Sequence, residues 1–290
     1  MRVVDLLHYG ATQLESAGVE QASLEVELLL GFCLEKNRTG LFLAATDEVD
    51  ERHEQQFLSL LARRSKYEPS AYILGEKEFW SLPFLVTPDV LIPRPETEFL
   101  LETVLALNKN EQWQPDLVLD LCCGSGVIAI ILALETGRSV TAVDISAPAL
   151  QVARRNAIRH QVADRLALVQ ADLFSAFSPR HIFGLVVSNP PYVSRQELRD
   201  RLQPEVMHFE PHLALDGGVD GLDIIQRIRM TLPRVLKPGG DFFMEIGADQ
   251  GLAVMQLFSG DDTGEKIFER VEVLQDYSGR DRVLHARMAT

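Results

Sequence analysis

The sequence predicts an α/β protein in which a doubly wound, mostly parallel sheet follows a small all-α domain and a linker with a β-hairpin. From about residue 96 onward, short apolar runs alternate with segments of helical pattern. This alternation implies parallel strands with helices on both faces of the sheet. Residues 1–75 carry helical patterns only, and the 290 residues are enough for two domains. We therefore expect domains at 1–75 and 96–290, joined by a linker at 76–95.

The helical prediction for the first domain depends on two segments. "SLEVELLLGFCLEK" has apolar residues at helical spacing, and "DEVDERHEQQFLSLLARRSKYEP" places Phe57, Leu58 and Leu61 on one face and stops before Pro69. The linker "EKEFWSLPFLVTPDVLIPRP" has a different composition, with aromatics, prolines and short β-branched runs. Such a composition is typical of a hairpin flanked by turns.

In the second domain, five predicted strands follow one another along the chain. They are "DLVLDLC", "SVTAVDIS", "LALVQADLF", "IFGLVVSNPPY" and "GDFFMEIG". Predicted helices include "GSGVIAIILALETG", which ends at Gly137, and "APALQVARRNAIRHQ". The tail "RVEVLQDYSGRDRVLHARM" predicts two further strands joined by a turn. In open α/β sheets ligands bind beyond the carboxyl ends of the strands, and the motifs described next fall at those ends.

The composition disfavours several classes of protein. A net charge of −14 argues against binding nucleic acid mainly through phosphate neutralisation, although it is compatible with a local basic patch or with solubility alone. No apolar run approaches the ~18 residues that span a bilayer, and the N-terminus lacks the pattern of a secretory signal. Three cysteines, Cys33, Cys122 and Cys123, suit neither a disulfide framework nor a zinc site. We expect a cytoplasmic protein with no membrane partner and no metal.

A small-residue turn, "DLCCGSGVIA", joins the first of these strands to a helix. Gly124 and Gly126 lack a Cβ, so a ligand can approach the backbone, and the helix N-terminus offers free N–H groups. The spacing Gly124-x-Gly126-x-x-Ala129 also matches the dinucleotide fingerprint G-x-G-x-x-G/A. That match alone is weak, because a purely structural tight turn has the same residues.

Acidic residues stand at three successive strand ends: Asp120, Asp144 and Asp172. Each alone is typical of a helix cap or a solvated strand end. Asp120 would repel a pyrophosphate, whereas together the three suit a ligand with a cationic amino-acid part, a ribose and an adenine. S-adenosylmethionine has these parts, and S-adenosylhomocysteine would be its product. The predicted cofactor-binding residues are Asp120, Cys122, Gly124, Gly126, Asp144, Ile145, Asp172, Leu173 and Asn189.

The motif "NPPY" follows the fourth strand and predicts the methyl acceptor. Transfer from a sulfonium requires the acceptor atom to be held ~3 Å from the methyl carbon, and such positioning can supply ~7–11 kcal/mol. Asn189 Oδ1 and the Pro190 carbonyl can accept both hydrogens of a planar –NH2 group. Pro190 and Pro191 stiffen the loop, and Tyr192 can stack on the flat group. The acceptor is then a conjugated –NH2: a glutamine amide or an exocyclic amine of adenine or guanine.

The segment after "NPPY" anchors this loop. "SRQELRDRLQPEV" begins with Ser194 and has Glu197 three residues later, which is a capping box. The predicted acceptor loop is therefore fixed between a buried strand and a capped helix, as positioning requires. The alternative interpretation of "NPPY" involves no ligand: a structural turn stiffened by its prolines, with Asn189 as a helix cap. Asn189, Pro190 and Tyr192 are the predicted catalytic residues.

On these motifs residues 90–290 resemble the class I S-adenosylmethionine-dependent methyltransferases, and "VLKPGGDFFMEIG" carries the resemblance further. The resemblance implies a Rossmann-like sheet whose last strand is antiparallel. The family's loop commonly reads D-x-G-x-G-x-G, whereas Cys122 replaces the first glycine here. Cys122 fits if its φ stays below zero. We interpret Cys122 and Cys123 as small packing residues and not as nucleophiles.

The whole chain resembles the HemK/PrmC family of protein-(glutamine-N5) methyltransferases. The resemblance is carried by the helical N-terminal domain, "LIPRPETE", "DLCCGSG", "NPPY" and "FEPHLALDGGVDGLD". It implies that the acceptor is the glutamine of the Gly-Gly-Gln motif of peptide chain release factors, and that the helical domain docks this protein substrate unless it is only an appendage. It also implies a substrate site formed by Arg94, Pro95, Glu96 and Thr97, by Asn189 to Tyr192, and by Glu210 and Pro211. If the resemblance is set aside, a surface ion pair between Arg94 and Glu96 explains these two residues as well as a substrate site does.

Three other hypotheses remain open on the residues. The same chemistry can act on a ribosomal-protein glutamine or on an exocyclic amine of RNA or DNA. The net charge and the lack of a dense Lys/Arg stripe argue against stable binding of nucleic acid. A nicotinamide oxidoreductase would use the glycine loop but leaves "NPPY" without a task. A non-catalytic adaptor is disfavoured by the intact "NPPY".

Overall fold

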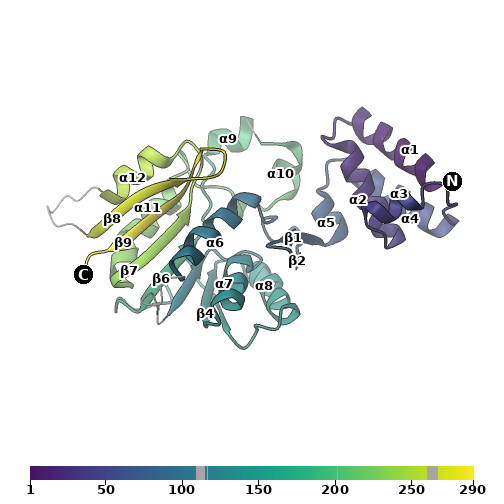
Figure 1. Cartoon of the computed structure of the whole chain (residues 1–290). Coiled ribbons are helices and arrows are strands. Elements are labelled where there is room, and N and C mark those ends of the chain that lie inside the picture. Colours follow the sequence, from purple (N-terminus) through teal and green to yellow (C-terminus); the bar gives the residue numbers. More distant parts are fainter. Residues whose placement is uncertain (109–114, 116, 201, 260–266) are drawn as a thin grey trace. The chain divides into compact units, whose positions relative to one another are not determined.

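The computed structural model describes residues 1–108, 115, 117–200, 202–259 and 267–290. The chain divides into two compact units (Figure 1). The helical unit consists of Met1–Glu76 with Gln203–Phe209, and the sheet unit consists of Lys77–Leu202 with Glu210–Thr290. The predicted fold class is confirmed, because a small helical region accompanies a seven-stranded, mostly parallel sheet. Sequence analysis did not anticipate that residues 203–209 join the helical unit.

In the helical unit, the helices before residue 76 pack around one apolar core. Val26, Leu30 and Phe57 are completely buried there. Arg64 is also buried, and its guanidinium pairs with Glu25 at 2.9 Å and with Glu205 at 2.7 Å, which ties the later segment to the helices that precede it. The helices are α1 (Val3–Ser16), α2 (Ala22–Leu34), α3 (Arg38–Leu43), α4 (Glu51–Arg64), α5 (Ser70–Leu74) and α10 (Pro204–Phe209).

The predicted hairpin is formed by β1 (Glu76–Phe79) and β2 (Leu82–Leu85). Its two turn residues, Trp80 and Ser81, have φ of 55° and 56°, as a type I′ turn requires. The buried amide of Asn156 holds β2 in place, since it accepts a hydrogen bond from Leu85 N at 2.8 Å and donates one to the Leu85 carbonyl at 3.0 Å.

The sheet has the strand order β5-β4-β3-β6-β7-β9-β8. All neighbours are parallel except that β9 runs antiparallel to both β7 and β8, so the prediction of an antiparallel last strand is confirmed. The strand β3 pairs with β4 on one side and with β6 on the other, which makes it the point where the winding reverses. The strands are β3 (Val118–Leu121), β4 (Val140–Asp144), β5 (Leu166–Gln170), β6 (Phe183–Ser188), β7 (Leu236–Glu245), β8 (Phe268–Gln275) and β9 (Asp281–Met288).

Helices cover both faces of the sheet, as Figure 1 shows. Because side chains alternate along a strand, Val118 packs with the helices on one face and Leu119 with those on the other. The first face carries α6 (Pro95–Asn108), α7 (Val127–Thr136) and α8 (Ala147–Arg159), and the second carries α11 (Asp223–Thr231) and α12 (Gly251–Ser259). No described helix is long and apolar enough to cross a membrane.

The strand β7 begins at Leu236, four residues before the predicted "GDFFMEIG". Leu236 pairs with Phe183 of β6, and the register then shifts so that Asp241 pairs with Leu185. The "KPGG" segment forms this irregularity, with Gly239 at φ 69°. The sequence prediction started this strand at Gly240, and proline and glycine within a strand are restricted to such irregular positions.

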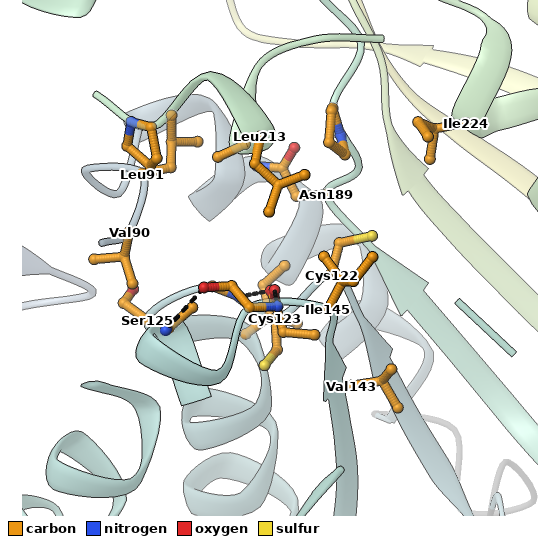
Figure 2. Close-up of a pocket in the computed structure, with 18 of the residues that line it drawn as sticks. Val90, Leu91, Cys122, Cys123, Ser125, Val143, Ile145, Asn189, Leu213 and Ile224 are labelled. Carbon is orange, nitrogen blue, oxygen red and sulfur yellow. Dashed lines mark hydrogen bonds between the residues drawn. The ribbon is translucent and has the colours of Figure 1, made fainter. Parts of the chain in front are cut away.

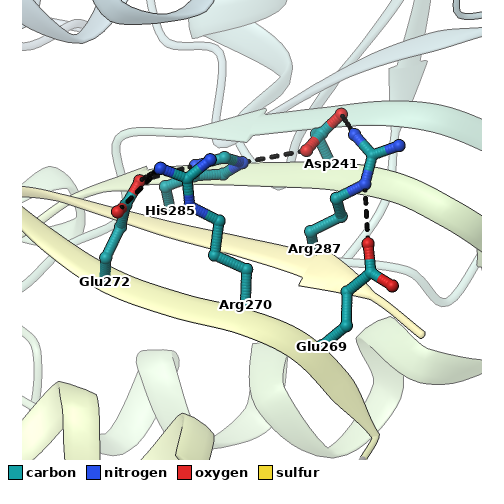
Figure 3. Close-up of polar contacts among 6 residues, drawn as sticks. All are labelled: Asp241, Glu269, Arg270, Glu272, His285 and Arg287. Atoms are coloured by element: carbon teal, nitrogen blue, oxygen red, sulfur yellow. Dashed lines mark hydrogen bonds and ion pairs between the residues drawn. The ribbon is translucent and has the colours of Figure 1, made fainter.

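A polar cluster links the last three strands (Figure 3). His285 on β9 is buried and stacks on Phe243 with ring centroids 4.2 Å apart. Its Nε2 lies 2.9 Å from Asp241 Oδ1 on β7, and its Nδ1 lies 3.1 Å from Glu272 Oε1 on β8. Arg287 pairs with the same Asp241 at 3.0 Å. The cluster fixes the register of the antiparallel edge that supports β7.

Candidate active site

A cavity of about 250 Å³ opens beyond the carboxyl ends of β3 to β6. Figure 2 shows Asn189 and Leu213 above the loop that carries Cys122, Cys123 and Ser125. The cavity lies at the reversal of strand order, where sequence analysis placed the motifs. Of the predicted site residues, those that line it are Arg94, Thr97, Cys122, Gly124, Asp144, Ile145, Asp172, Leu173, Asn189, Pro191 and Pro211. Those that do not line it are Pro95, Glu96, Asp120, Gly126, Pro190, Tyr192 and Glu210.

The loop after β3 turns through three left-handed residues. Cys122, Gly124 and Gly126 have φ of 64°, 51° and 83°. The condition stated for cysteine at position 122, a φ below zero, is therefore not met. The turn needs the left-handed conformation where the family commonly has glycine, and cysteine adopts it at a cost of about 1–2 kcal/mol. Gly126 has a packing role, because a Cβ there would lie 3.0 Å from the Ala153 Cβ.

Both cysteines of this loop are partly or fully buried. Burial raises the pKa of the Cys122 and Cys123 thiols well above the usual range, and the charge of Asp144 adds to the effect. Thiols in this state are protonated and poorly nucleophilic at neutral pH. This agrees with their interpretation as packing residues.

Asp144, the last residue of β4, holds the loop against the sheet. Its Oδ2 accepts a hydrogen bond from Gly124 N at 2.8 Å, and its Oδ1 accepts one from Ser146 N at 2.9 Å. Burial raises the pKa of this carboxyl, and the two backbone N–H groups oppose the shift. Each carboxylate oxygen keeps a second lone pair, so Asp144 can still accept hydrogen bonds from a ligand's hydroxyl groups.

The other two predicted acids have different environments. Asp120 is completely buried, and its Oδ2 accepts a hydrogen bond from Ala129 N in the first turn of α7 at 3.0 Å. Burial raises the pKa of Asp120 to about 8. Asp172 is instead half exposed on the cavity wall, where it forms an ion pair with Arg227 at 2.7 Å.

The "NPPY" loop leaves the end of β6, where the Ser188 hydroxyl donates to the Leu121 carbonyl at 2.8 Å. Asn189 lines the cavity and its Nδ2 donates to Thr97 Oγ1 at 3.1 Å. Tyr192 is not part of the cavity wall; its hydroxyl donates to Glu245 Oε1 at 3.0 Å. The stacking of Tyr192 on the acceptor thus remains a prediction.

The predicted capping box after the loop is present. Ser194 Oγ accepts a hydrogen bond from Glu197 N at 3.2 Å, and Glu197 Oε2 accepts one from Ser194 N at 3.2 Å. It starts the helix α9 (Arg195–Asp200). On the other side, Gln250 Nε2 donates to the Tyr192 carbonyl at 2.9 Å. The acceptor loop is therefore held at both ends.

Arg94 and Glu210 form a second link beside the cavity. The Arg94 guanidinium pairs with the Glu210 carboxylate, whose other oxygen accepts a hydrogen bond from Ile92 N at 3.2 Å. The alternative Arg94–Glu96 ion pair is not formed. Glu210 is buried and faces this link, and the next residue, Pro211, reaches the cavity wall.

Sequence analysis missed Glu245. This residue ends β7, next to the end of β6, and is 1% exposed. Its Oε2 accepts a hydrogen bond from Thr97 Oγ1 at 2.6 Å. Burial raises the pKa of its carboxyl, and the hydrogen bonds from Thr97 and Tyr192 oppose this. A carboxylate inside the apolar run "FFMEIG" was the signal that could have revealed it.

The strand order, the antiparallel last strand and a cavity bounded by a glycine loop and "NPPY" define the class: a Rossmann-like methyltransferase of class I. A methyltransferase of known structure from Pyrococcus furiosus has a similar fold, with a TM-score of 0.51 at 15% identity over 74% of this chain and 92% of that one. Two family models also match, the PrmC N-terminal domain over residues 5–75 and the methyltransferase small domain over residues 95–219.

Curated relatives match nearly the whole chain. A release factor glutamine methyltransferase from Koribacter versatilis is 42% identical over 96% of this chain and 95% of its own length. Another of the same name, from Cereibacter sphaeroides, is 40% identical over 99% of each chain. The chain belongs to the release factor glutamine methyltransferase family, and the predicted resemblance to HemK/PrmC is confirmed.

Proposed function

We propose that this protein transfers a methyl group from S-adenosylmethionine to the side-chain N5 of the glutamine in the Gly-Gly-Gln motif of peptide chain release factors. The observation that carries the proposal is the orientation of Asn189. Its Nδ2 is engaged with Thr97, so its Oδ1 is left to accept a hydrogen bond from an acceptor –NH2 in the cavity. The names of the relatives support the choice of substrate.

The cavity wall fits the proposed cofactor. A Cβ built on Gly124 meets no atom within 4 Å, so the space beside this backbone is open to a ligand. Asp144 retains acceptor capacity for ribose hydroxyls, and the half-exposed apolar side chain of Ile145 can cover an adenine face. When bound, S-adenosylmethionine supplies a methyl group on a positively charged sulfur. Asp172 and Leu173 complete the predicted adenine end of the cavity.

In the proposed mechanism the chain acts by positioning. Asn189 Oδ1 accepts one amide hydrogen, which orients the nitrogen and returns electron density to it. The Pro190 carbonyl, which is not part of the cavity wall, stays the predicted acceptor of the second hydrogen. An N–CH3 bond forms as the S–CH3 bond breaks, and the cationic amide nitrogen then loses one proton to solvent. The rigid mounting of Asn189 between β6 and the capped helix α9 holds the nitrogen in line. Positioning of this kind can supply about 7–11 kcal/mol.

The residues around the opening support a protein substrate. Leu213 lines the cavity with 57% of its surface exposed, and Pro211 precedes it. Apolar contacts of this kind suit a peptide loop, and Arg94 anchors their segment through Glu210. The helical unit is proposed to bind the body of the release factor. A ribosomal-protein glutamine or an exocyclic amine of RNA or DNA has the same acceptor chemistry. Methylation of one of these alternative substrates is therefore one of the results that the test below can give.

The test incubates the full chain and labelled S-adenosylmethionine with a release factor, with ribosomal proteins and with RNA in separate reactions. We expect label in the release factor alone, and mass spectrometry of its Gly-Gly-Gln peptide should place one methyl on the glutamine. The matched control is a release factor with this glutamine changed to asparagine. Label in RNA or ribosomal protein, with none in the release factor, would overturn the proposed substrate.

A further inference from the structure

A buried chain of hydrogen bonds lies behind the acceptor loop. Asn189 Nδ2 donates to Thr97 Oγ1 at 3.1 Å, Thr97 Oγ1 donates to Glu245 Oε2 at 2.6 Å, and Tyr192 Oη donates to Glu245 Oε1 at 3.0 Å. Thr97 is 2% exposed and Glu245 is 1% exposed. This series of hydrogen bonds connects the first turn of α6, the end of β7 and the loop after β6, which are far apart in the sequence.

The chemistry of these groups fixes which one donates and which one accepts in each hydrogen bond. Both Glu245 oxygens receive hydrogen bonds, as in an ionised carboxylate, which is an acceptor only. The Thr97 hydroxyl has one hydrogen, which it donates to Glu245, so toward Asn189 it can offer only a lone pair. The Asn189 amide must then present Nδ2 to Thr97 and keep Oδ1 for the cavity.

We propose that Thr97, oriented by Glu245, is a positioning residue for methyl transfer, because its hydroxyl sets which end of the Asn189 amide faces the acceptor nitrogen. The inference rests on the proposed function, in which Asn189 Oδ1 accepts an acceptor hydrogen. The reversed amide would direct its Nδ2 donors at an –NH2 group that itself donates, and the hydrogen bond would be lost. Thr97 touches neither proposed reacting atom and acts through Asn189.

The same carboxylate also holds the other end of the motif. Tyr192 donates to Glu245, and its carbonyl accepts from Gln250 Nε2 at 2.9 Å. Glu245 therefore fixes both the first and the last residue of "NPPY" relative to the sheet. This explains why a carboxylate is buried at the end of an apolar strand, where it would otherwise be unfavourable.

Two substitutions of Thr97 separate its hydroxyl from its methyl group. Thr97→Val keeps the shape and removes the hydroxyl, whereas Thr97→Ser keeps the hydroxyl and removes the methyl. We expect Thr97→Val to lower kcat on the release factor by on the order of 10- to 100-fold. We expect Thr97→Ser to stay within about 3-fold of wild type. The Kd for S-adenosylhomocysteine should change less than about 2-fold in both variants, because the orientation of the Asn189 amide affects binding of the acceptor –NH2 group and not of the cofactor.

Two kinetic outcomes would overturn the inference: a kcat of Thr97→Val that is no lower than that of Thr97→Ser, or a weaker cofactor affinity that accounts for the loss. The side-chain amide resonance of Asn189 gives a readout independent of activity. Its Nδ2 protons should exchange slowly in wild type and Thr97→Ser and faster in Thr97→Val, and equal exchange in all three would also overturn it. If wild type does not methylate the release factor, the proposed function fails, and the exchange measurement still decides whether Thr97 holds the Asn189 amide in one orientation.

Discussion

Ala129 N donates a hydrogen bond to Asp120 Oδ2 over 3.0 Å, which ties the first turn of α7 to the strand that precedes it. The Asp120 carboxyl is completely buried, and its Oδ1 has no hydrogen-bond partner among the described residues. Burial raises the pKa of Asp120 from 3.8 to about 8; the Ala129 N–H opposes this, and the charge of Asp144 adds to it. The carboxyl thus holds the glycine loop and favours the protonated form at neutral pH.

This raised pKa predicts a pH dependence of stability. The unfolded chain loses the Asp120 proton near pH 4, whereas the folded chain keeps it until about pH 8. The contribution of Asp120 is therefore fully present below pH 4 and is lost as the pH rises toward 8. In Asp120→Asn this loss is absent, so the free energy of unfolding of the variant minus that of wild type should increase between pH 5 and 8 by on the order of a few kcal/mol. Urea unfolding at both pH values measures this, and parallel profiles would contradict the prediction.

The left-handed conformation of Cys122 predicts which substitutions the loop accepts. At φ 64° a glycine has no Cβ strain, while a β-branched residue is strongly disfavoured. Cys122→Gly should stay within about 1 kcal/mol of wild type, because relief of strain offsets the lost packing and the greater freedom of the unfolded chain. Cys122→Val should be less stable by about 2 kcal/mol or more. Thermal unfolding, with S-adenosylhomocysteine absent and present, measures the stability of both variants. A Cys122→Val protein as stable as Cys122→Gly would contradict the left-handed conformation of residue 122.

Asn189→Ala should separate catalysis from cofactor binding. The substitution removes the proposed acceptor for the substrate –NH2, so methyl transfer to the release factor should fall to background, a loss of at least about 10²-fold. The Kd for S-adenosylhomocysteine, measured by titration calorimetry, should remain nearly unchanged because the loop 122–126 and Asp144 are untouched. Strong residual turnover would remove the role given to Asn189, and a large loss of cofactor affinity would move that role to the cofactor.

The sequence predicted those parts of the fold that depend on local pattern. The strands and the type of the N-terminal domain follow from apolar periodicity, and the capping box of Ser194 and Glu197 from residues three positions apart. The early start of β7 was missed because Leu236 pairs with Phe183 across an irregularity that local propensity disfavours. The conformation of Cys122 was missed because cysteine favours negative φ, and only the closed turn imposes the left-handed conformation.

The contacts that complete the site were beyond sequence reasoning. Thr97 and Glu245 lie 148 positions apart, and only the pairing of β7 beside β6 brings the carboxylate next to the start of α6. Arg94 and Glu210 are 116 positions apart, and the nearer Glu96 offered a simpler partner. In contrast, cavity residues such as Asn189 and Asp144 could be predicted from the sequence. They follow or end strands, and ligands of open α/β sheets bind beyond the carboxyl ends of the strands.

The Arg94–Glu210 pair predicts an energetic coupling within the sheet unit. Glu210 is buried while Arg94 is about one-third exposed, so Arg94→Met removes a cation from beside a buried carboxylate. We expect a loss of about 1–3 kcal/mol for Arg94→Met, reduced from the fully buried case because solvent reaches the guanidinium. Adding Glu210→Gln should recover part of it, since a neutral amide needs no cation. A double-mutant cycle in urea measures the coupling, and strictly additive effects would show that the two side chains do not support each other.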